Sequence, residues 1–334
     1  MYRITYIDIS SKIFDSSYIY TLKIMGLFDL PKSPRKLSDG NIGGGISYGL
    51  SSAQGRRRDM QDDHNAIAGI PQIKNDVSWF AVFDGHGGSS VSKHCSEHLF
   101  RALTMDTELI NVLESGLEKG DKEQMKTVKT SISKGFLATD RKIKTIEGAK
   151  DSGSTAVCVL ITKTHIIMMN CGDSRGTICT KIKTNNGSVI CKPTIATVDH
   201  KPEMPSELER IQAANGYVFN NRLKGVLGVS RSFGDFKYKG DATLDPLKQM
   251  ITPEPDFYIK IREPKKDEFL ILACDGVWDV MSLNEVCDYV YSNVRKFDAK
   301  SLKSVSEEIV DLCLAKGSMD NITIIIIDLA SPSV

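Results

Sequence analysis

Hydrophobic positions along the chain alternate between patterns typical of strands and patterns typical of helices. Apolar runs such as Trp79–Phe83, His165–Asn170 and Phe269–Cys274 have the length and composition of buried strands. Between the first two runs, apolar residues recur at every fourth position from Val91 to Leu103, which predicts a helix with one buried stripe. The chain therefore mixes both kinds of element.

The order of these elements indicates a fold class. Four strands are expected in series within residues 155–192, whereas helices are expected in separate blocks near residues 122–144, 205–214 and 282–317. A repeating βαβ unit would instead place a helix between each pair of strands. We predict an α+β fold in which packed antiparallel sheets are flanked by helices.

The first part of the chain has a different composition. Residues 31–45 contain two prolines and four glycines among charged residues, which predicts irregular structure. The regular alternation of elements begins at Ile46. We therefore expect an irregular lead-in over residues 1–45 and a single domain over residues 46–330.

Composition and charge exclude several classes of protein. Lys and Arg total 43 against 42 for Asp and Glu, so nothing indicates wholesale binding to nucleic acid or to an anionic membrane. No apolar stretch approaches the roughly 18 to 20 residues of a membrane span, and no secretory signal is evident. We expect a cytoplasmic protein, with the nucleus as a second location.

The cysteines and one N-terminal dipeptide bear on the compartment. The eight cysteines occur singly, several within apolar runs, which predicts buried thiols in a reducing compartment rather than disulfides or a zinc site. Met25-Gly26 offers an alternative start with a glycine for N-myristoylation, which would attach the chain to membranes. Leu30 occupies the position where that signal favours Ser or Thr, so the match is incomplete.

Aspartates lie at the ends of four strongly apolar strands. Asp84, Asp173 and Asp275 each follow one of these strands, and Asp320 precedes the strand Ile322–Ile327. Any one of them is explained by the frequency of Asp in turns, but four together favour a converging cluster. Converging carboxylates repel one another unless a cation lies among them, and oxygen ligands suit Mg²⁺ or Mn²⁺.

Two further side chains are candidates for chemistry on a phosphate. His86 lies in the glycine-rich sequence Asp84–Gly88, where it could donate a proton to a leaving group. One arginine of the basic run Arg56–Arg58 could bind a phosphate with two hydrogen bonds if it lies close to the carboxylates. The spacing of Cys95 and Arg101 matches cysteine-dependent phosphatases, but Cys95 falls on the apolar stripe of a predicted helix, so we reject that chemistry.

Eight segments, taken in order, resemble the metal-dependent protein serine/threonine phosphatases of type 2C, and in particular their animal alpha/beta members. They span about Ile46 to Leu329, and eight ordered blocks are more specific than any single motif. The segments are Tyr48–Asp62, Phe83–Gly88, Ser152–Ala156, Asn170–Arg175, Asp199–Pro202, Val229–Asp235, Asp275–Asp279 and Asp320-Asn321. The helical extension that follows the catalytic domain of those members is not expected here.

The resemblance implies a four-layer α-β-β-α sandwich, with residues 46–330 as the catalytic domain. It implies that Asp84, Asp275 and Asp320 hold one Mg²⁺ or Mn²⁺ ion, and that Asp84 and the Gly85 carbonyl hold a second. Asp173 and Asp275 would hold a weaker third ion, Arg57 would bind the phosphate and His86 would be the general acid. A hydroxide bridging two ions would hydrolyse phosphoserine or phosphothreonine in protein substrates, without a covalent intermediate and in a monomeric enzyme.

The chain departs from the family pattern at Gln61. The family has glutamate there, as a ligand of the second ion, and glutamine lacks its negative charge. We therefore expect the second ion to bind more weakly. An alternative hypothesis is a degenerate relative that binds phosphoproteins without turnover; the physiological substrate, pathway and preferred metal stay open.

Overall fold

The structure is a computed structural model that describes residues 35–41, 46–71, 73, 76–296 and 301–330. These residues belong to one unit of the chain, Pro34–Val334, and they alone are discussed below. The dipeptide Met25-Gly26 lies outside the described residues. The helices of the described part include none that is long and apolar enough to cross a membrane.

The larger of two main sheets has six antiparallel strands in the order β1-β2-β16-β15-β9-β10. Its central strand β16 pairs with β2 on one side and with β15 on the other, so the two ends of the domain sequence meet in one sheet. Its strands are β1 (Arg35–Asn41), β2 (Ser47–Ala53), β9 (Arg175–Lys183), β10 (Val189–Ala196), β15 (Asp267–Ala273) and β16 (Ile322–Asp328).

The second main sheet has five antiparallel strands in the order β14-β8-β7-β4-β3. Its strands are β3 (Asp63–Ile67), β4 (Ser78–Phe83), β7 (Ala156–Ile161), β8 (His165–Cys171) and β14 (Asp256–Ile261). Two smaller sheets complete the strand pairing: β5 (Gly85–His86), β6 (Gly153–Ser154) and β13 (Phe233–Gly234) form one, and β11 (Val218–Phe219) and β12 (Arg222–Leu223) form the other.

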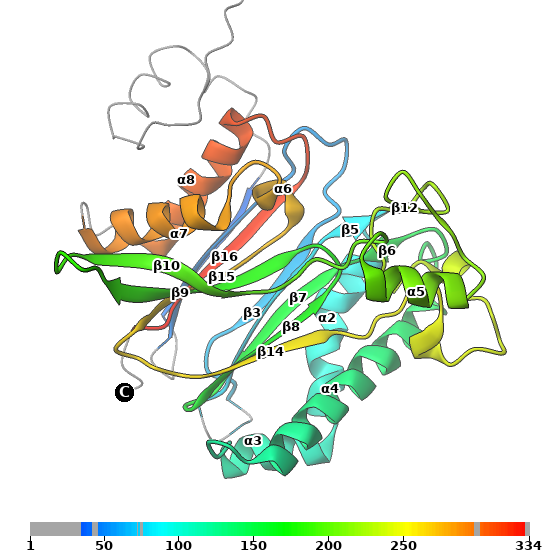
Figure 1. Ribbon diagram of the computed structural model, residues 1–334, viewed down its shortest axis with the longest axis horizontal. Helices are drawn as coiled ribbons and strands as arrows, with labels where there is room; N and C mark the ends of the chain where they lie inside the picture. The colour runs from blue at the N-terminus through cyan, green and yellow to red at the C-terminus, as the bar shows by residue number, and fades with distance from the viewer. Residues whose placement is uncertain (1–34, 42–45, 72, 74–75, 297–300, 331–334) are drawn as a thin grey trace, which may run out of the picture. The chain divides into compact units, whose positions relative to one another are not determined.

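Helices cover the outer faces of both main sheets, as Figure 1 shows. The five-stranded sheet is covered by α2 (Ser90–Thr104), α3 (Thr107–Ser115) and α4 (Lys122–Ile143). The six-stranded sheet is covered by α6 (Asp275–Trp278), α7 (Leu283–Tyr291), α8 (Leu302–Ala315) and the π-helical turn η3 (Ser292–Lys296). Helix α5 (Pro205–Ala213) and the short 3₁₀ helices η1 (Phe236–Tyr238) and η2 (Pro246–Lys248) lie beyond the strand ends. The predicted α+β sandwich with four layers, α-β-β-α, is confirmed.

The alternation of side chains along β4 shows why the layers form. Trp79, Ala81 and Phe83 belong to the core that packs against α2 and α4, whereas Phe80 and Val82 belong to the core between the two sheets. Successive side chains of a strand point to opposite faces, so a continuously apolar strand is buried on both. All five of these side chains are fully buried.

Two other predictions can be compared with the structure. All eight cysteines are buried and none forms a disulfide. Irregular structure over residues 31–45 is wrong for residues 35–41, because Arg35–Asn41 pairs along its whole length with β2 as edge strand β1. This pairing uses backbone groups, which every residue carries, so β1 forms although its sequence has neither an apolar run nor an apolar-polar alternation. The rest of the lead-in lies outside the described residues.

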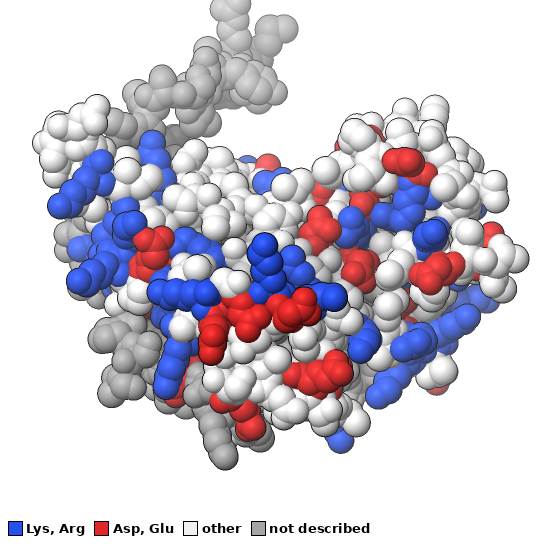
Figure 2. Space-filling model, turned by 60° about the horizontal axis from the view of Figure 1, so that its bottom comes forward, with Lys and Arg blue, Asp and Glu red and all other residues white. Residues whose placement is uncertain are grey.

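Charged side chains of both signs are interspersed on the face of the molecule drawn in Figure 2, where lysine and arginine lie beside aspartate and glutamate. This distribution agrees with a formal net charge of +1. No large patch of charge of one sign therefore marks a binding site on that face.

Candidate active site

The aspartates at the strand ends meet at one end of the two main sheets. Asp84 follows β4, Asp173 lies two residues beyond β8, and Asp275 opens α6 directly after β15. Carboxylate oxygens of these three residues all lie within 4.8 Å of one another. Asp320 lies just before β16, the neighbour of β15, and its carboxylate is paired with Arg57.

Folding places these carboxylates in a strongly unfavourable electrostatic environment. Burial raises the pKa of Asp84 well above its usual range, and the negative charges of the other carboxylates raise it further. Burial and its neighbours likewise raise the pKa of Asp275 to about 8. We refer to the residues that act on one another in this way as the acidic cluster: Asp62, Asp84, Asp173, Asp275 and Asp320.

The donor set of the acidic cluster fits a hard divalent cation. It offers carboxylate oxygens and lies beside the Gly85 carbonyl, which are the ligand types that Mg²⁺ and Mn²⁺ prefer. Cys274 has its sulfur within 4.8 Å of oxygens of Asp62 and Asp84, but burial raises the pKa of its thiol well above the usual range. A protonated thiol is a poor ligand, so the set remains one of oxygens.

Asp62 is a member of the acidic cluster to which the sequence analysis gave no role. It is 8% exposed, and its carboxylate accepts a hydrogen bond of 2.7 Å from the Thr323 hydroxyl. Burial raises its pKa to about 7, although that hydrogen bond opposes the shift. Its position directly after Gln61 in a matching segment was the only pattern that pointed to it.

Arg57 comes from the loop between β2 and β3. Its Nη2 lies 2.6 Å from Asp320 Oδ2, and its side chain remains 56% exposed. The amide of Gln54 donates to the carbonyls of Arg57 and Arg58, both at 2.9 Å, which shapes the loop. The guanidinium therefore lies at the edge of the acidic cluster with most of its surface open to solvent.

Gln61 lies against the turn that contains Gly85. With the amide oriented to satisfy both groups, its nitrogen donates to the Gly85 carbonyl and its oxygen accepts from the Gly88 N–H, each at 3.3 Å. A side chain at Gly85 would overlap the backbone carbonyl of Gln61 and crowd the Ser92 hydroxyl. Only glycine therefore lets the backbones of residues 61 and 85 lie this close together. The glutamine thus contacts the carbonyl that was predicted as a ligand of the second ion.

His86 follows Gly85 on β5 and is paired with a residue far away in sequence. Its Nε2 lies 2.7 Å from Oδ2 of Asp235, whose side chain is only 3% exposed. Burial alone would lower the pKa of His86, but the hydrogen bond and charge of Asp235 outweigh it and raise the pKa. Asp235 lies in the matching segment Val229–Asp235 but was not predicted to have a role, because the sequence does not show that it lies beside His86.

Comparisons with known proteins assign the family. The family model described as Protein phosphatase 2C matches residues 46–322. The chain belongs to the protein phosphatase 2C family. It is 43% identical to Protein phosphatase 1B of Rattus norvegicus, over 92% of this chain and 76% of that protein. It is equally 43% identical to Protein phosphatase 1A of Homo sapiens, over 91% of this chain and 76% of that protein.

Solved structures share the fold. A phosphatase from Toxoplasma gondii superposes with a TM-score of 0.70 at 22% identity, covering 90% of this chain and 97% of that one. A sex-determining protein of C. elegans superposes with a TM-score of 0.67 at 23% identity, covering 87% and 66%. The predicted resemblance to the type 2C family and its alpha/beta members is confirmed, and the protein is a metal-dependent protein phosphatase.

Asp173 is paired with Lys201, and His200 holds the backbone of the residue before it. Lys201 Nζ lies 2.5 Å from Asp173 Oδ2, which places an ammonium group where a third ion was predicted to bind. His200 forms two hydrogen bonds with Gly172, the residue before Asp173. The backbone N–H of His200 donates to the Gly172 carbonyl at 2.9 Å, and its Nδ1 accepts from the Gly172 N–H at 3.1 Å. Lys201 was not predicted as a site residue.

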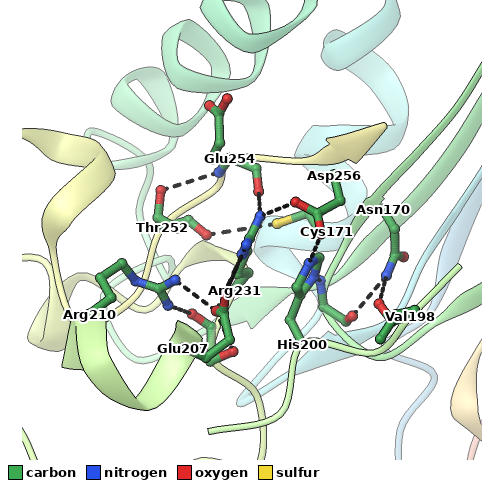
Figure 3. A network of polar contacts seen from close by, with 12 residues as sticks. Asn170, Cys171, Val198, His200, Glu207, Arg210, Arg231, Thr252, Glu254 and Asp256 are labelled. Atoms are coloured by element: carbon green, nitrogen blue, oxygen red, sulfur yellow. Dashed lines mark hydrogen bonds and ion pairs between the residues drawn. The ribbon is translucent and has the colours of Figure 1, made fainter. Parts of the chain in front are cut away.

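His200 leads away from the acidic cluster into a second group of charges, drawn in Figure 3. Its Nε2 lies 3.1 Å from Asp256 Oδ2, and Asp256 accepts from Arg231 at 2.8 Å. Arg231 and Arg210 in turn donate to the buried Glu207 of α5, at 2.8 and 2.7 Å. We call this group the ion-pair network: His200, Glu207, Arg210, Arg231 and Asp256.

Charges balance within the ion-pair network. Burial alone would raise the pKa of Glu207, but hydrogen bonds and charge from Arg231 and Arg210 lower it to about 2. The hydrogen bond from His200 and the charge of Arg231 lower the pKa of Asp256 to about 2 as well, against the effect of burial. The network therefore keeps its carboxylates ionised without any bound ion, and it fixes His200 and hence the backbone before Asp173.

Proposed function

We propose that this phosphatase hydrolyses phosphoserine and phosphothreonine in protein substrates, with two Mg²⁺ or Mn²⁺ ions and a weaker third ion. The observation that carries the proposal is the acidic cluster, in which five carboxylates raise one another's pKa and two of them form direct ion pairs, with Arg57 and Lys201. An excess of buried negative charge is stable only with bound cations or bound protons.

The chain offers ligands for each ion. Asp84, Asp275 and Asp320 would hold the first, and Asp84 with the Gly85 carbonyl would hold the second. The Gln61 amide oxygen would join them only when the amide turns away from the Gly88 N–H. Asp173 with Asp275 would hold the third, in competition with Lys201. When bound, divalent ions neutralise phosphate charge and make a nearby water more acidic, which supplies the nucleophile for hydrolysis.

Arg57 and His86 would act on the substrate itself. The exposed guanidinium of Arg57 has N–H donors beyond the one bound to Asp320, so it can bind and orient phosphate oxygens. His86 would protonate the oxygen of serine or threonine as the bond to phosphorus breaks, because an alkoxide is a poor leaving group. Asp84 would help to hold the ions.

The remaining features of the proposal concern the whole chain. We infer a catalytic domain over residues 46–330, acting as a monomer on phosphoproteins in the cytoplasm and the nucleus. N-myristoylation would require translation to start at Met25. The similarity to Protein phosphatases 1A and 1B over more than nine-tenths of the chain supports the assignment to this class of enzyme.

The test is hydrolysis of a phosphothreonine peptide across a titration of Mn²⁺ and of Mg²⁺. We expect metal-dependent release of phosphate that is lost in Asp275→Ala, whose folding is verified by circular dichroism. Activity in the presence of excess chelator, or undiminished activity of Asp275→Ala, would contradict the proposal.

A second candidate function is phosphoprotein binding without turnover. The observation that favours it is Gln61, because its amide contacts the Gly85 carbonyl that the second ion would need. Folded protein that binds the phosphopeptide in an anisotropy titration, but releases no phosphate at tens of millimolar metal, would establish this alternative.

A further inference from the structure

Three short segments that are distant in sequence form a small sheet beside the acidic cluster. Its strand order is β13-β6-β5, and its register places His86 opposite Gly153 and Gly153 opposite Gly234. Asp235 follows β13 directly, and its N–H donates to the Ser152 carbonyl at 3.0 Å. The small sheet thereby brings the carboxylate of Asp235 to the ring of His86, across 149 residues of sequence.

Asp235 is held in place from several sides. Its backbone adopts the left-handed conformation, with φ of 52° and ψ of 39°, which is uncommon for residues other than glycine. The hydroxyl of Ser232 donates to its Oδ2 at 2.6 Å, the same oxygen that faces His86 at 2.7 Å. The preceding Gly234 N–H donates to Asp140 at 2.8 Å. A residue kept in such a conformation and so fully anchored has little freedom to turn away.

Gly153 closes the other side of the pair. A methyl group at this position would overlap both Asp235 Oδ2 and His86 Nε2. The glycine therefore leaves room for the two side chains to meet, and they meet directly against its backbone. Contact with Gly153 and the hydrogen bond of Nε2 to Asp235 together restrict the orientation of the His86 ring.

We propose that Asp235 is a positioning residue that fixes the ring of His86 through Nε2 and presents Nδ1 to the leaving oxygen of the substrate. This inference rests on the proposed role of His86 as general acid. Asp235 accepts the Nε2–H hydrogen bond, and the described residues provide no hydrogen-bond partner for Nδ1. The proton on Nδ1 passes to the oxygen that leaves phosphorus, Nε2–H stays on Asp235, and water restores the Nδ1 proton after product release.

The leaving group distinguishes this role from a structural one. Phosphothreonine releases an alkoxide that needs a proton, whereas p-nitrophenyl phosphate releases a stabilised phenolate that does not. We expect Asp235→Ala to lower kcat for a phosphothreonine peptide by about 10²-fold, with KM nearly unchanged, and to lower kcat for p-nitrophenyl phosphate less than about threefold. In a His86→Ala background, Asp235→Ala should cause no further loss.

Gly153→Ala and Asp140→Asn extend the test. Gly153→Ala should cause the same selective loss by separating the pair, and it serves if Asp235→Ala does not fold. Asp140→Asn keeps an oxygen that can accept from the Gly234 N–H and does not touch the ring, so it should change kcat for both substrates by one common factor. Nitrogen-15 spectra of the neutral His86 ring should show the Nε2–H form in the wild type and a mixture of both forms in Asp235→Ala.

Equal losses on both substrates in Asp235→Ala, or an additive loss in the double variant, would overturn the inference. So would an unchanged ring spectrum. Failure of the proposed function has a different signature, because the wild type itself would then hydrolyse neither substrate.

Discussion

The acidic cluster and the ion-pair network both contain charged side chains that folding has buried, such as Asp62 and Glu207, and the pKa values of these groups shift in opposite directions. In the acidic cluster, burial and mutual repulsion raise the pKa of Asp62 to about 7 and of Asp275 to about 8. In the ion-pair network, arginines hold the pKa of Glu207 at about 2. The two groups are connected through Gly172: its N–H donates to His200 of the ion-pair network, and the next residue is Asp173 of the acidic cluster.

The difference lies in where the compensating charge comes from. The ion-pair network contains its own cations, in bidentate and shared hydrogen bonds, so it is complete when the chain is folded. The acidic cluster has more anions than cations and is complete only with something bound. A complete network is suited to support, and an incomplete cluster is suited to binding and chemistry. Four predictions test this contrast.

The largest expected effect is on the complete network. Arg231→Met removes the arginine that pairs with both Glu207 and Asp256, leaving a carboxylate that is 2% exposed without its main partner. We expect the free energy of unfolding in urea to fall by about 3–5 kcal/mol. The matched control is Lys266→Met, which breaks an exposed pair with Glu263 and should lower the free energy of unfolding far less, because solvent screens exposed ion pairs. Equal losses in the two variants would contradict the contrast.

The second effect is the loss of the network's stability in acid. A carboxyl group whose folded-state pKa is lowered contributes stability that is fully present above its unfolded value, here 4.5, and lost as the pH falls towards 2. For Glu207 this contribution is on the order of 3 kcal/mol. Urea unfolding at pH 5, 4 and 3 should show a steeper decline for the wild type than for Glu207→Gln. Parallel declines would mean that Glu207 is not the group responsible.

The third effect concerns Gln61 in the incomplete cluster. Gln61→Glu supplies the missing negative charge and removes the amide nitrogen that donates to the Gly85 carbonyl. We expect the concentration of Mn²⁺ for half-maximal rate to fall by about 10–100-fold, and direct Mn²⁺ binding by electron paramagnetic resonance to tighten in parallel. Gln212→Glu adds the same charge at an exposed position of α5 and should change neither quantity. An unchanged binding curve in Gln61→Glu would argue against a role for Gln61 at the second ion.

The smallest effect is a gain in stability. In excess chelator at pH 8, Asp275→Asn removes a buried carboxylate that is repelled by Asp173 and Asp320. We expect the midpoint of thermal unfolding to rise by about 2 °C, corresponding to about 1 kcal/mol. With saturating metal the same substitution should lower the midpoint, because a ligand has been lost. A decrease under both conditions would show that the carboxylate is structurally compensated within the chain.

The fold was predictable wherever burial repeats along the sequence. The runs Trp79–Phe83 and Phe269–Ala273 are apolar at every position because each is covered on both faces. The stripe through Cys95 marks the face of α2 that packs on the sheet. Strand β1 was not predictable, since an edge strand is specified by backbone pairing with β2 rather than by side-chain pattern.

The site was predictable where residues lie next to strands. The positions of Asp84, Asp173 and Asp275 at strand ends were enough to predict that they lie close together, because packed sheets bring the ends of their strands to one edge. Lys201 and Asp235 were not found in this way. Their partners are set by loop paths and by a left-handed residue, and the spacing of residues in the sequence carries no information about either.

The small sheet β13-β6-β5 has a consequence for how the protein acquires activity during folding. Its three strands contribute only two residues each and come from widely separated parts of the chain, so none can form a stable local structure first. Contacts between segments that are distant in sequence form slowly, so the small sheet should form only after the two main sheets hold its strands close together. In a refolding experiment, secondary structure should therefore return before the pairing of His86 with Asp235, and helical signal should precede catalytic competence. The pair is a marker of completed folding. On the role proposed for Asp235, small local openings near Gly234 would lower turnover of phosphothreonine substrates in molecules that still appear native by circular dichroism.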